Sequence, residues 1–238
     1  MGRPPVRPAH CCILPVVTPP ASLLFTALVL GAQHSFGPDH IAAVGLFVSR
    51  SPSWKRALGL GIRWGIGHST TILLLGGALA LSGLRLPPRF GPAMERVVGA
   101  TLIALGVLAA VRATRLHGHW HEHDGVQHWH LHTHHTSAGH DHDHRTLLGL
   151  GMVHGLAGTG ALVLMIPVAM AATPHRALLF LATFGLGTVL SMALFSAVAG
   201  GVLARMGHAS LAFARGAALL AAAGSVTIGL WWLLVGGA

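Results

Sequence analysis

Charged residues are scarce in this chain of 238 amino acids. They make up 9% of the sequence, whereas hydrophobic residues make up 53%. Soluble domains carry about 25% charged residues. The composition therefore excludes an ordinary soluble domain and predicts an all-α polytopic membrane protein whose main partner is the lipid bilayer.

Motifs of several enzyme classes are also missing. The chain has a single lysine, Lys55, and no P-loop sequence, so it does not hydrolyse ATP through a P-loop. Neither the metalloprotease motif H-E-x-x-H nor the nucleophile motif G-x-S-x-G occurs. The only cysteines, Cys11 and Cys12, are adjacent in a proline-rich segment, which excludes a disulfide framework and a thiol relay through the membrane. We expect no enzymatic activity and no organic cofactor.

Positive charge exceeds negative charge, with 15 basic residues against 6 acidic ones and a formal charge of +9. These basic residues gather at the ends of apolar runs and are not interleaved with aromatic residues, so they form no nucleic-acid-binding face. We interpret them as anchors at the membrane surface and as signals for topology. No nucleic acid is expected as a partner.

Long apolar runs dominate the rest of the sequence. About 20 residues suffice to cross a bilayer as a helix, and six runs reach this length. They lie at about residues 21–48, 57–82, 94–113, 147–171, 177–203 and 213–236. The expected division of the chain is a flexible proline-rich segment, a first three-helix repeat, a disordered His-rich loop and a second three-helix repeat, at residues 1–20, 21–113, 114–146 and 147–238. A signal peptide is the alternative interpretation of the first segment.

The two halves of the chain share short motifs. Leu30-Gly31-x-x-His34 recurs as Leu150-Gly151-x-x-His154, and Trp64-Gly-Ile-Gly67 recurs as Phe184-Gly-Leu-Gly187, both at an offset of 120 residues. These matches indicate an internal duplication. Because three helices per half is an odd number, the two repeats are expected to be inverted in the membrane, as in many secondary transporters.

The first apolar run contains two histidines and a carboxylate, His34, Asp39 and His40. Ionisable groups at membrane depth cost about 2.5 kcal/mol or more each, so they usually have a function. In an unbroken helix Asp39 would lie about 140° and His40 about 240° around the axis from His34. Gly37 and Pro38 are expected to break the helix between them, because proline has no N–H to donate. The break would free the His34 carbonyl and predicts a cation site.

His68, in the second run, is expected at a similar depth to this site and completes the predicted ligand set of His34, Asp39, His40 and His68. A structural histidine bonded to a neighbouring carbonyl is the alternative for His68. At the offset of 120, Thr159 corresponds to Asp39, so most ligands should come from the first half. His154 and Thr159 are candidates for additional ligands.

Residues 117–144 are unusually rich in histidine. Twelve of these 28 residues are histidines, most of them two positions apart. Residues with this spacing do not share a helix face, and we expect an extended segment that collects metal ions. A pH-sensitive polycationic linker is the alternative. The histidines are His117, His119, His121, His123, His128, His130, His132, His134, His135, His140, His142 and His144.

The sequence His34-x4-Asp39-His40-Ile-Ala-Ala resembles the His-x4-Asp-His motif of the nickel/cobalt transporter (NiCoT) family, and Gly65-Ile-Gly-His-Ser-Thr70 resembles the next conserved helix of that family. The His-rich loop resembles that of nickel/cobalt efflux members, and the six-run length resembles the urease accessory branch. The later acidic motif of the family is absent, because Gly158-Thr-Gly160 carries no carboxylate. The resemblance implies a bacterial inner-membrane location and a transported nickel or cobalt ion.

Three functions remain open from the sequence. The first is a secondary transporter of Ni²⁺ or Co²⁺, and the second is a membrane-tethered nickel-binding protein that supplies a metalloenzyme such as urease, with a metallochaperone as a further partner. A Zn²⁺ exporter with the same site is the third. Imidazole and carboxylate donors suit these transition metals better than Mg²⁺ or Ca²⁺.

Overall fold

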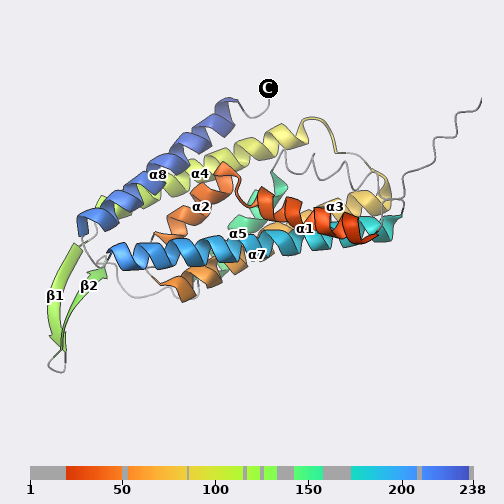
Figure 1. Cartoon of the computed structure of the whole chain (residues 1–238). Coiled ribbons are helices and arrows are strands. Elements are labelled where there is room, and N and C mark those ends of the chain that lie inside the picture. Colours follow the sequence, from red (N-terminus) through yellow and green to blue (C-terminus); the bar gives the residue numbers. More distant parts are fainter. Residues whose placement is uncertain are drawn as a thin grey trace, which may run out of the picture.

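The computed structural model describes residues 20–49, 53–84, 86–114, 117–123, 126–132, 142–157, 173–207 and 211–235. Within these ranges the chain forms helices and one two-stranded sheet (Figure 1). The helices are α1 (Pro20–His34), α2 (Pro38–Val48), α3 (Trp54–Ser82), α4 (Phe90–Thr114), α5 (His142–Leu156), α7 (Pro174–Gly207) and α8 (Leu211–Leu234). The strands are β1 (His117–His123) and β2 (Val126–His132).

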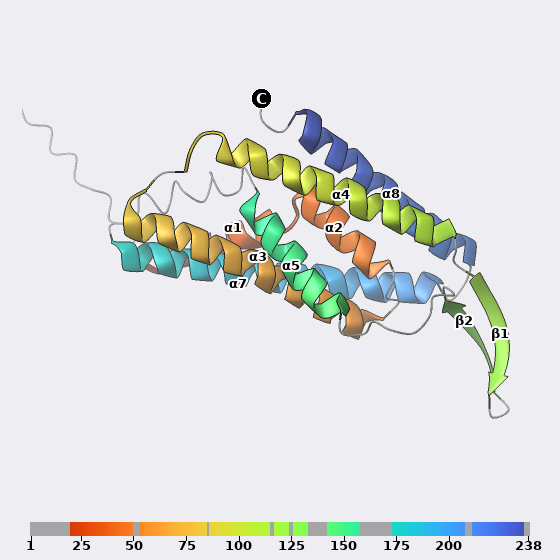
Figure 2. The same ribbon diagram turned by 180° about the vertical axis from the view of Figure 1, so that it is seen from behind.

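The helices pack in two groups, with α2 between them. Helices α4 and α8 pack side by side, and α3 packs against α7 on the other side of the molecule (Figures 1 and 2). Helix α1 lies on α7, and α5 lies on α3. The hairpin of β1 and β2 projects from one end of this helical body (Figure 1).

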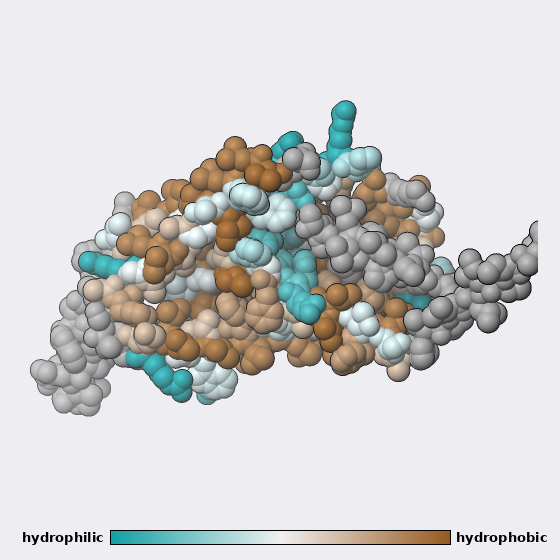
Figure 3. All heavy atoms as spheres, turned by 45° about the horizontal axis from the view of Figure 1, so that its top comes forward, coloured by the Kyte–Doolittle hydropathy of each residue, from teal (hydrophilic) through white to brown (hydrophobic). Residues whose placement is uncertain are grey.

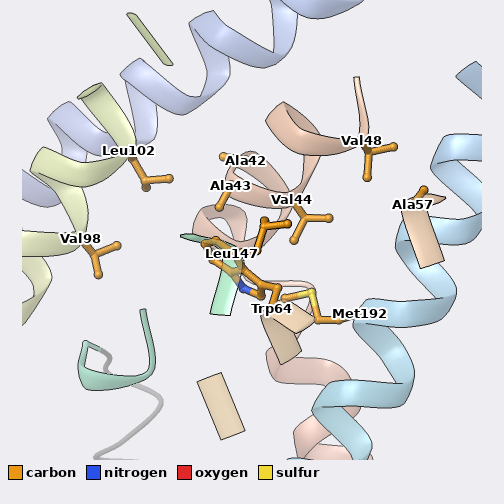
Figure 4. Close-up of a cluster of buried hydrophobic side chains, with 10 residues drawn as sticks. All are labelled: Ala42, Ala43, Val44, Val48, Ala57, Trp64, Val98, Leu102, Leu147 and Met192. Atoms are coloured by element: carbon orange, nitrogen blue, oxygen red, sulfur yellow. The ribbon is translucent and has the colours of Figure 1, made fainter. Parts of the chain in front are cut away.

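Helix α2 supplies much of the core. Its buried apolar residues contact side chains from α3, α4, α5 and α7 in one cluster (Figure 4). Leu46 packs on the other side, against Ala109 of α4 and Ala222 of α8. The short helix is therefore enclosed by both helix groups. The cluster in Figure 4 consists of Ala42, Ala43, Val44, Val48, Ala57, Trp64, Val98, Leu102, Leu147 and Met192.

The face of the molecule seen in Figure 3 is largely apolar outside the grey residues. Many large hydrophobic side chains are exposed, including Phe25, Leu74 and Leu220 at 69%, 64% and 76%. Four of the described helices, α3, α4, α7 and α8, are long and apolar enough to cross a membrane. An apolar surface on membrane-length helices is what contact with lipid requires.

Two of the six predicted spans do not appear as single membrane-length helices among the described residues. The run predicted at 21–48 is divided into α1 and α2, each shorter than a membrane span. The run predicted at 147–171 begins earlier, at His142, and its described helix ends at Leu156. The rest of that run lies outside the described residues. The prediction of a helical membrane protein is confirmed, and six complete spans remain a prediction.

Three helices of the second half begin about 120 residues after three helices of the first half. Helix α5 begins 122 residues after α1 (142 and 20), α7 begins 120 after α3 (174 and 54), and α8 begins 121 after α4 (211 and 90). The two members of each pair run in opposite directions through the molecule (Figures 1 and 2).

Close helix contacts repeat at the same offset. A Cβ atom added to Gly31 of α1 would overlap the carbonyl oxygen of Phe184 in α7, and one added to Gly151 of α5 would overlap that of Trp64 in α3. Both members of the second contact lie 120 residues from those of the first. Gly67 against Leu148 and Gly187 against Leu28 form a second such pair. Helix α1 is therefore held tightly to α7, and α5 to α3, because only glycine permits this approach.

We expect Gly151→Ala to lower the thermal stability of the protein in detergent. The added methyl group would overlap the Trp64 carbonyl and force α5 away from α3, and overpacking of this kind costs about 1–3 kcal/mol. Gly149→Ala is the matched control, because a Cβ at this position of the same helix meets nothing within 4 Å. Equal melting temperatures for the two variants would contradict the close contact.

The His-rich segment is more ordered than predicted. Within the expected disordered loop, β1 and β2 pair as an antiparallel hairpin, and α5 begins at His142. The expectation of a segment without secondary structure was wrong for these residues. Histidines two positions apart cannot share one helix face, but their spacing matches the two-residue period of a strand.

Candidate metal site

The first apolar run is broken at the predicted place. Helix α1 ends at His34, Gly37 is the N-cap of α2, and Pro38 is the first residue of α2. The predicted helix break is confirmed, and its cause is the missing N–H of Pro38. The His34 carbonyl is nevertheless not freed, since it accepts a hydrogen bond of 2.9 Å from the Gly37 N–H. The expectation of a free carbonyl ligand was therefore wrong.

The break places a carboxylate at the start of a helix. Asp39 lies in the first turn of α2, where the backbone N–H groups that have no helical partner make the potential positive. This position stabilises a negative charge inside the helical body. The side chain of Asp39 remains 17% exposed, so the carboxylate is only partly buried.

Hydroxyl groups attach the broken end of α1 to α7. The Ser35 hydroxyl donates to the carbonyls of Gly31, at 3.1 Å, and Thr188, at 3.2 Å. The Thr188 hydroxyl lies 3.2 Å from the same Gly31 carbonyl. These bonds and the close contact of Gly31 with Phe184 hold His34, one residue before Ser35, in a defined position.

Three imidazoles meet at this end of α1. The Nε2 atom of His34 lies 3.1 Å from Nε2 of His68 on α3 and 3.1 Å from Nε2 of His40 on α2. Two nitrogens this far apart, bound to one ion at about 2.0–2.1 Å, would subtend an angle of about 95–102° at the metal. This angle lies between the octahedral and tetrahedral values. Each of these two nitrogen pairs is therefore spaced as two ligands of one transition-metal ion, and the three donors lie within 4.8 Å of one another.

A fourth histidine reaches the site from the second half of the chain. His154 of α5 is 1% exposed, and its Nε2 lies 3.3 Å from Oδ2 of Asp39. Its ring centroid is 5.1 Å from that of His40 and 5.1 Å from that of Trp64. Helix α5 brings His154 here because it packs closely on α3, as the contact between Gly151 and Trp64 shows.

Packing orients these rings more than hydrogen bonding through Nδ1 does. Among the described residues, no protein group hydrogen-bonds to the buried Nδ1 atoms of His40, His68 and His154. Ligand histidines commonly donate this second N–H to a carboxylate or a carbonyl. Here the Trp64 ring beside His154 and the Phe184 ring, 5.5 Å from that of His34, limit the movement of the imidazoles instead.

The predicted ligands come together, but in two groups. His34, His40 and His68 form one set of donors that lie within 4.8 Å of one another, and Asp39, His40 and His154 form another. Thr159 lies outside the described residues. Sequence reasoning did not identify Ser35 and Thr188 as positioning residues. For Thr188 a signal was available, because the offset of 120 makes this residue the counterpart of His68.

Within the described part of the chain, Arg63 forms no ion pair with Asp39 and so does not compete with a metal ion for this carboxylate. Its guanidinium lies beside Gly59, one helical turn towards the start of α3. In the described part of the chain, the Asp39 carboxylate instead lies 3.3 Å from Nε2 of His154. The carboxylate therefore faces histidines, as a metal site requires.

The strand register arranges the histidines of the hairpin. Three pairs of positions lie directly opposite each other, His117 with His132, His119 with His130 and His121 with His128. Because strand residues alternate between faces, these six positions and His123 share one face of the hairpin. His142 and His144 lie in the first turn of α5, and His134, His135 and His140 lie outside the described residues.

Comparison with known proteins agrees with a membrane location. Residues 23–226 match the family described as cytochrome c biogenesis protein transmembrane region. The urease accessory protein UreH of Bacillus sp. (strain TB-90) is 33% identical over 179 residues, which cover 75% of this chain and 76% of UreH. The cobalt transport protein NhlF of Rhodococcus rhodochrous is 33% identical over 91 residues, or 36% of this chain and 25% of NhlF. No solved structure matches.

The membrane-length helices and the matched family define the class of the protein as integral membrane. The chain belongs to the cytochrome c biogenesis transmembrane family, which it matches over most of its length. It is also similar to a protein named for urease accessory function and to a protein named for cobalt transport.

Proposed function

We propose that the protein is a secondary transporter of Ni²⁺ or Co²⁺ and a member of the nickel/cobalt transporter family. The observation that carries this proposal is the meeting of three Nε2 atoms, from His34, His40 and His68, beside the carboxylate of Asp39. The ion is the cargo, and no organic cofactor is involved. A bacterial inner membrane is the proposed location.

The donor set supports a transition metal. Imidazole nitrogens suit Ni²⁺, Co²⁺, Zn²⁺ and Cu²⁺, whereas Mg²⁺ and Ca²⁺ prefer oxygen ligands. One carboxylate only partly offsets the charge of a divalent cation, so the imidazoles must be neutral when they bind it. Zn²⁺ therefore belongs beside Ni²⁺ and Co²⁺ in any assay of selectivity.

The arrangement of the helices supports a transporter rather than a passive metal store. Helices paired at an offset of about 120 run in opposite directions and make reciprocal contacts. We interpret them as two inverted three-helix repeats within six spans. In transporters of this kind the substrate site lies near the middle of the membrane, at broken helices. The break between α1 and α2 is such a position.

A thiol relay is not proposed, although the matched family is named for cytochrome c biogenesis. The only cysteines of the chain are Cys11 and Cys12, and no apolar helix contains one. The described helices instead bring histidines together. The function therefore rests on metal ligands and not on thiols.

The similarity to UreH favours a second candidate, a nickel-binding accessory protein that supplies a metalloenzyme without moving the ion across the membrane. Reconstitution of the purified full-length protein into vesicles separates the two. A transporter releases Ni²⁺ or Co²⁺ into the lumen, where an enclosed dye detects it. Binding to the vesicles with no luminal metal would support the accessory function and contradict transport. Empty vesicles and Mg²⁺ are the controls.

We expect deletion of residues 117–141, which stops before α5, to raise the Ni²⁺ concentration needed for half-maximal flux while the maximal flux stays within about twofold. The hairpin projects from the helical body (Figure 1), and its histidine-rich composition is typical of a segment that collects metal. Vesicle flux measured over a range of Ni²⁺ concentrations tests this. Complete loss of flux at saturating metal would show that the hairpin is part of the ion path.

We expect the hairpin to be cytoplasmic. It lies at the same end of the molecule as the end of α2 and the start of α3 (Figures 1 and 2). In the sequence, Arg50, Lys55 and Arg56 follow α2 or begin α3. Positive residues beside the first spans favour the cytoplasmic side. A cysteine at Ser137, in a Cys11→Ser and Cys12→Ser background, should resist impermeant maleimide in intact cells and react after lysis. Labelling in intact cells would reverse the topology.

A further inference from the structure

The five donor side chains of the site do not form a single set. Two donors on one ion are at most about 4.4 Å apart when metal–ligand bonds are about 2.0–2.2 Å long. The donors that lie within 4.8 Å of one another are divided into His34, His40 and His68 on one side and Asp39, His40 and His154 on the other. An ion held by the first three therefore cannot bind all five without movement of the protein.

His40 is the shared member of both sets. Its ring centroid lies 4.7 Å from those of His34 and His68 and 5.1 Å from that of His154. The imidazole is 1% exposed, and its Nδ1 atom has no hydrogen-bond partner among the described residues. One ring thus lies between two groups of donors.

The two sets differ in charge. His34, His40 and His68 supply three neutral nitrogens to a divalent ion. In the second set, Asp39 and His154 take the places of His34 and His68. The carboxylate of Asp39 offsets part of the charge of the ion. An ion can therefore gain electrostatic energy as it passes from the first set to the second.

The packing of the helices gives this passage a mechanical basis. His68 and His154 are carried by α3 and α5, which are joined by the close contacts of Gly67 and Gly151. His40 and Asp39 are carried by α2, which is a separate short helix. A small displacement of α2 along the α3–α5 pair would move His40 towards one partner histidine or the other.

We infer that Asp39, His40 and His154 form a second cation subsite, and that the transported ion passes between the two subsites while it stays bound to His40. The inference rests on the proposed transport function. The ion exchanges His34 and His68 for Asp39 and His154. The ligand in the second subsite is a divalent transition-metal cation, the same cargo as in the first.

Cobalt absorption tests whether residue 154 binds the ion. In full-length protein with Cys11→Ser and Cys12→Ser, His154→Cys should give a thiolate-to-cobalt charge-transfer band on addition of Co²⁺, because a coordinating thiol is deprotonated. Ser196→Cys on α7 is the matched control, since Ser196 is 0% exposed and belongs to neither set. No band in His154→Cys, or an equal band in the control, would overturn the second subsite. This readout does not require transport.

Flux kinetics test whether there are two subsites or one. His154→Gln keeps an N–H near Asp39 but removes a good metal ligand. We expect it to lower maximal Ni²⁺ flux at least tenfold and to change the half-saturating concentration less than threefold, because the first subsite is intact. His68→Gln should instead raise the half-saturating concentration at least tenfold. Equal increases in both variants would show one five-ligand site, and wild-type flux in His154→Gln would also overturn the inference.

The two experiments separate the failure of the subsite from failure of the proposed function. If the wild-type protein moves no metal, transport is wrong, and the cobalt band alone decides whether the second subsite exists. If the wild-type protein moves metal and the band is missing, the subsite is wrong and transport stands.

Discussion

Asp39→Asn should abolish Ni²⁺ flux in vesicles without changing the amount of protein inserted. Asparagine has nearly the same volume as aspartate, but it removes the negative charge that faces His154 and the other histidines. An interaction between unit charges 4 Å apart is worth about 4 kcal/mol at an effective dielectric constant of 20. Its loss would weaken cation binding in the donor set that contains Asp39 about a thousandfold.

Glu95→Gln is the matched control for this experiment. Glu95 of α4 is also buried, at 7% exposure, but it belongs to neither donor set. Neutralising it should leave Ni²⁺ flux within about twofold of wild type. If both variants lose flux equally, general destabilisation is the cause, and wild-type flux in Asp39→Asn would contradict the proposed site.

His40→Gln should cause the second large loss, a decrease in Ni²⁺ flux of at least about a hundredfold. Mutation of residues that merely orient ligands costs about 10–100-fold in metal affinity or activity, and His40 lies in both donor sets. The measurement is flux at saturating Ni²⁺ with equal protein in the vesicles. Saturating Ni²⁺ is used because a high metal concentration would compensate for weaker metal binding in one donor set alone.

His175→Gln controls for the removal of a histidine as such. His175 lies at the exposed start of α7, outside both donor sets. Its variant should transport like wild type. If the His40→Gln variant recovers full flux at saturating Ni²⁺, then His40 does not bind the ion in both donor sets.

Local chemistry made part of this structure predictable. Pro38 cannot complete a helical hydrogen bond, so the end of α1 and the start of α2 followed from the sequence. The same break brought Asp39 and His40 towards His34. The His34 carbonyl was harder to predict, because a tighter turn lets the Gly37 N–H replace the missing donor.

Contacts between distant helices were less predictable. The distance of His154 from Asp39 depends on the approach of α5 to α3, which the backbone contact between Gly151 and Trp64 determines. Glycine-rich sequence signals close approach but does not name the partner helix. The division of five donors into two sets depends on the distances between donor atoms of different helices, which sequence spacing does not encode.

The hairpin shows how one pattern can be interpreted in two ways. Histidines two residues apart exclude one helix face, and they fit both an extended flexible segment and a strand. The pairing of Trp120 with Trp129 across the hairpin belongs to the same register as the histidine pairs. Aromatic residues favour strands, and this was a sequence signal for the hairpin.

The exchange of helix partners between the halves has a consequence for biosynthesis. Helix α1 packs on α7, and α5 packs on α3, so each half supplies the neighbour of a helix in the other. When the ribosome has completed α4, His34 and His68 are already in the membrane, but the helices that cover them are still unmade. The proposed site can be completed only after translation has passed the end of α7 at Gly207. The first half therefore waits for its packing partners during the synthesis of nearly a hundred further residues (from Thr114 to Gly207).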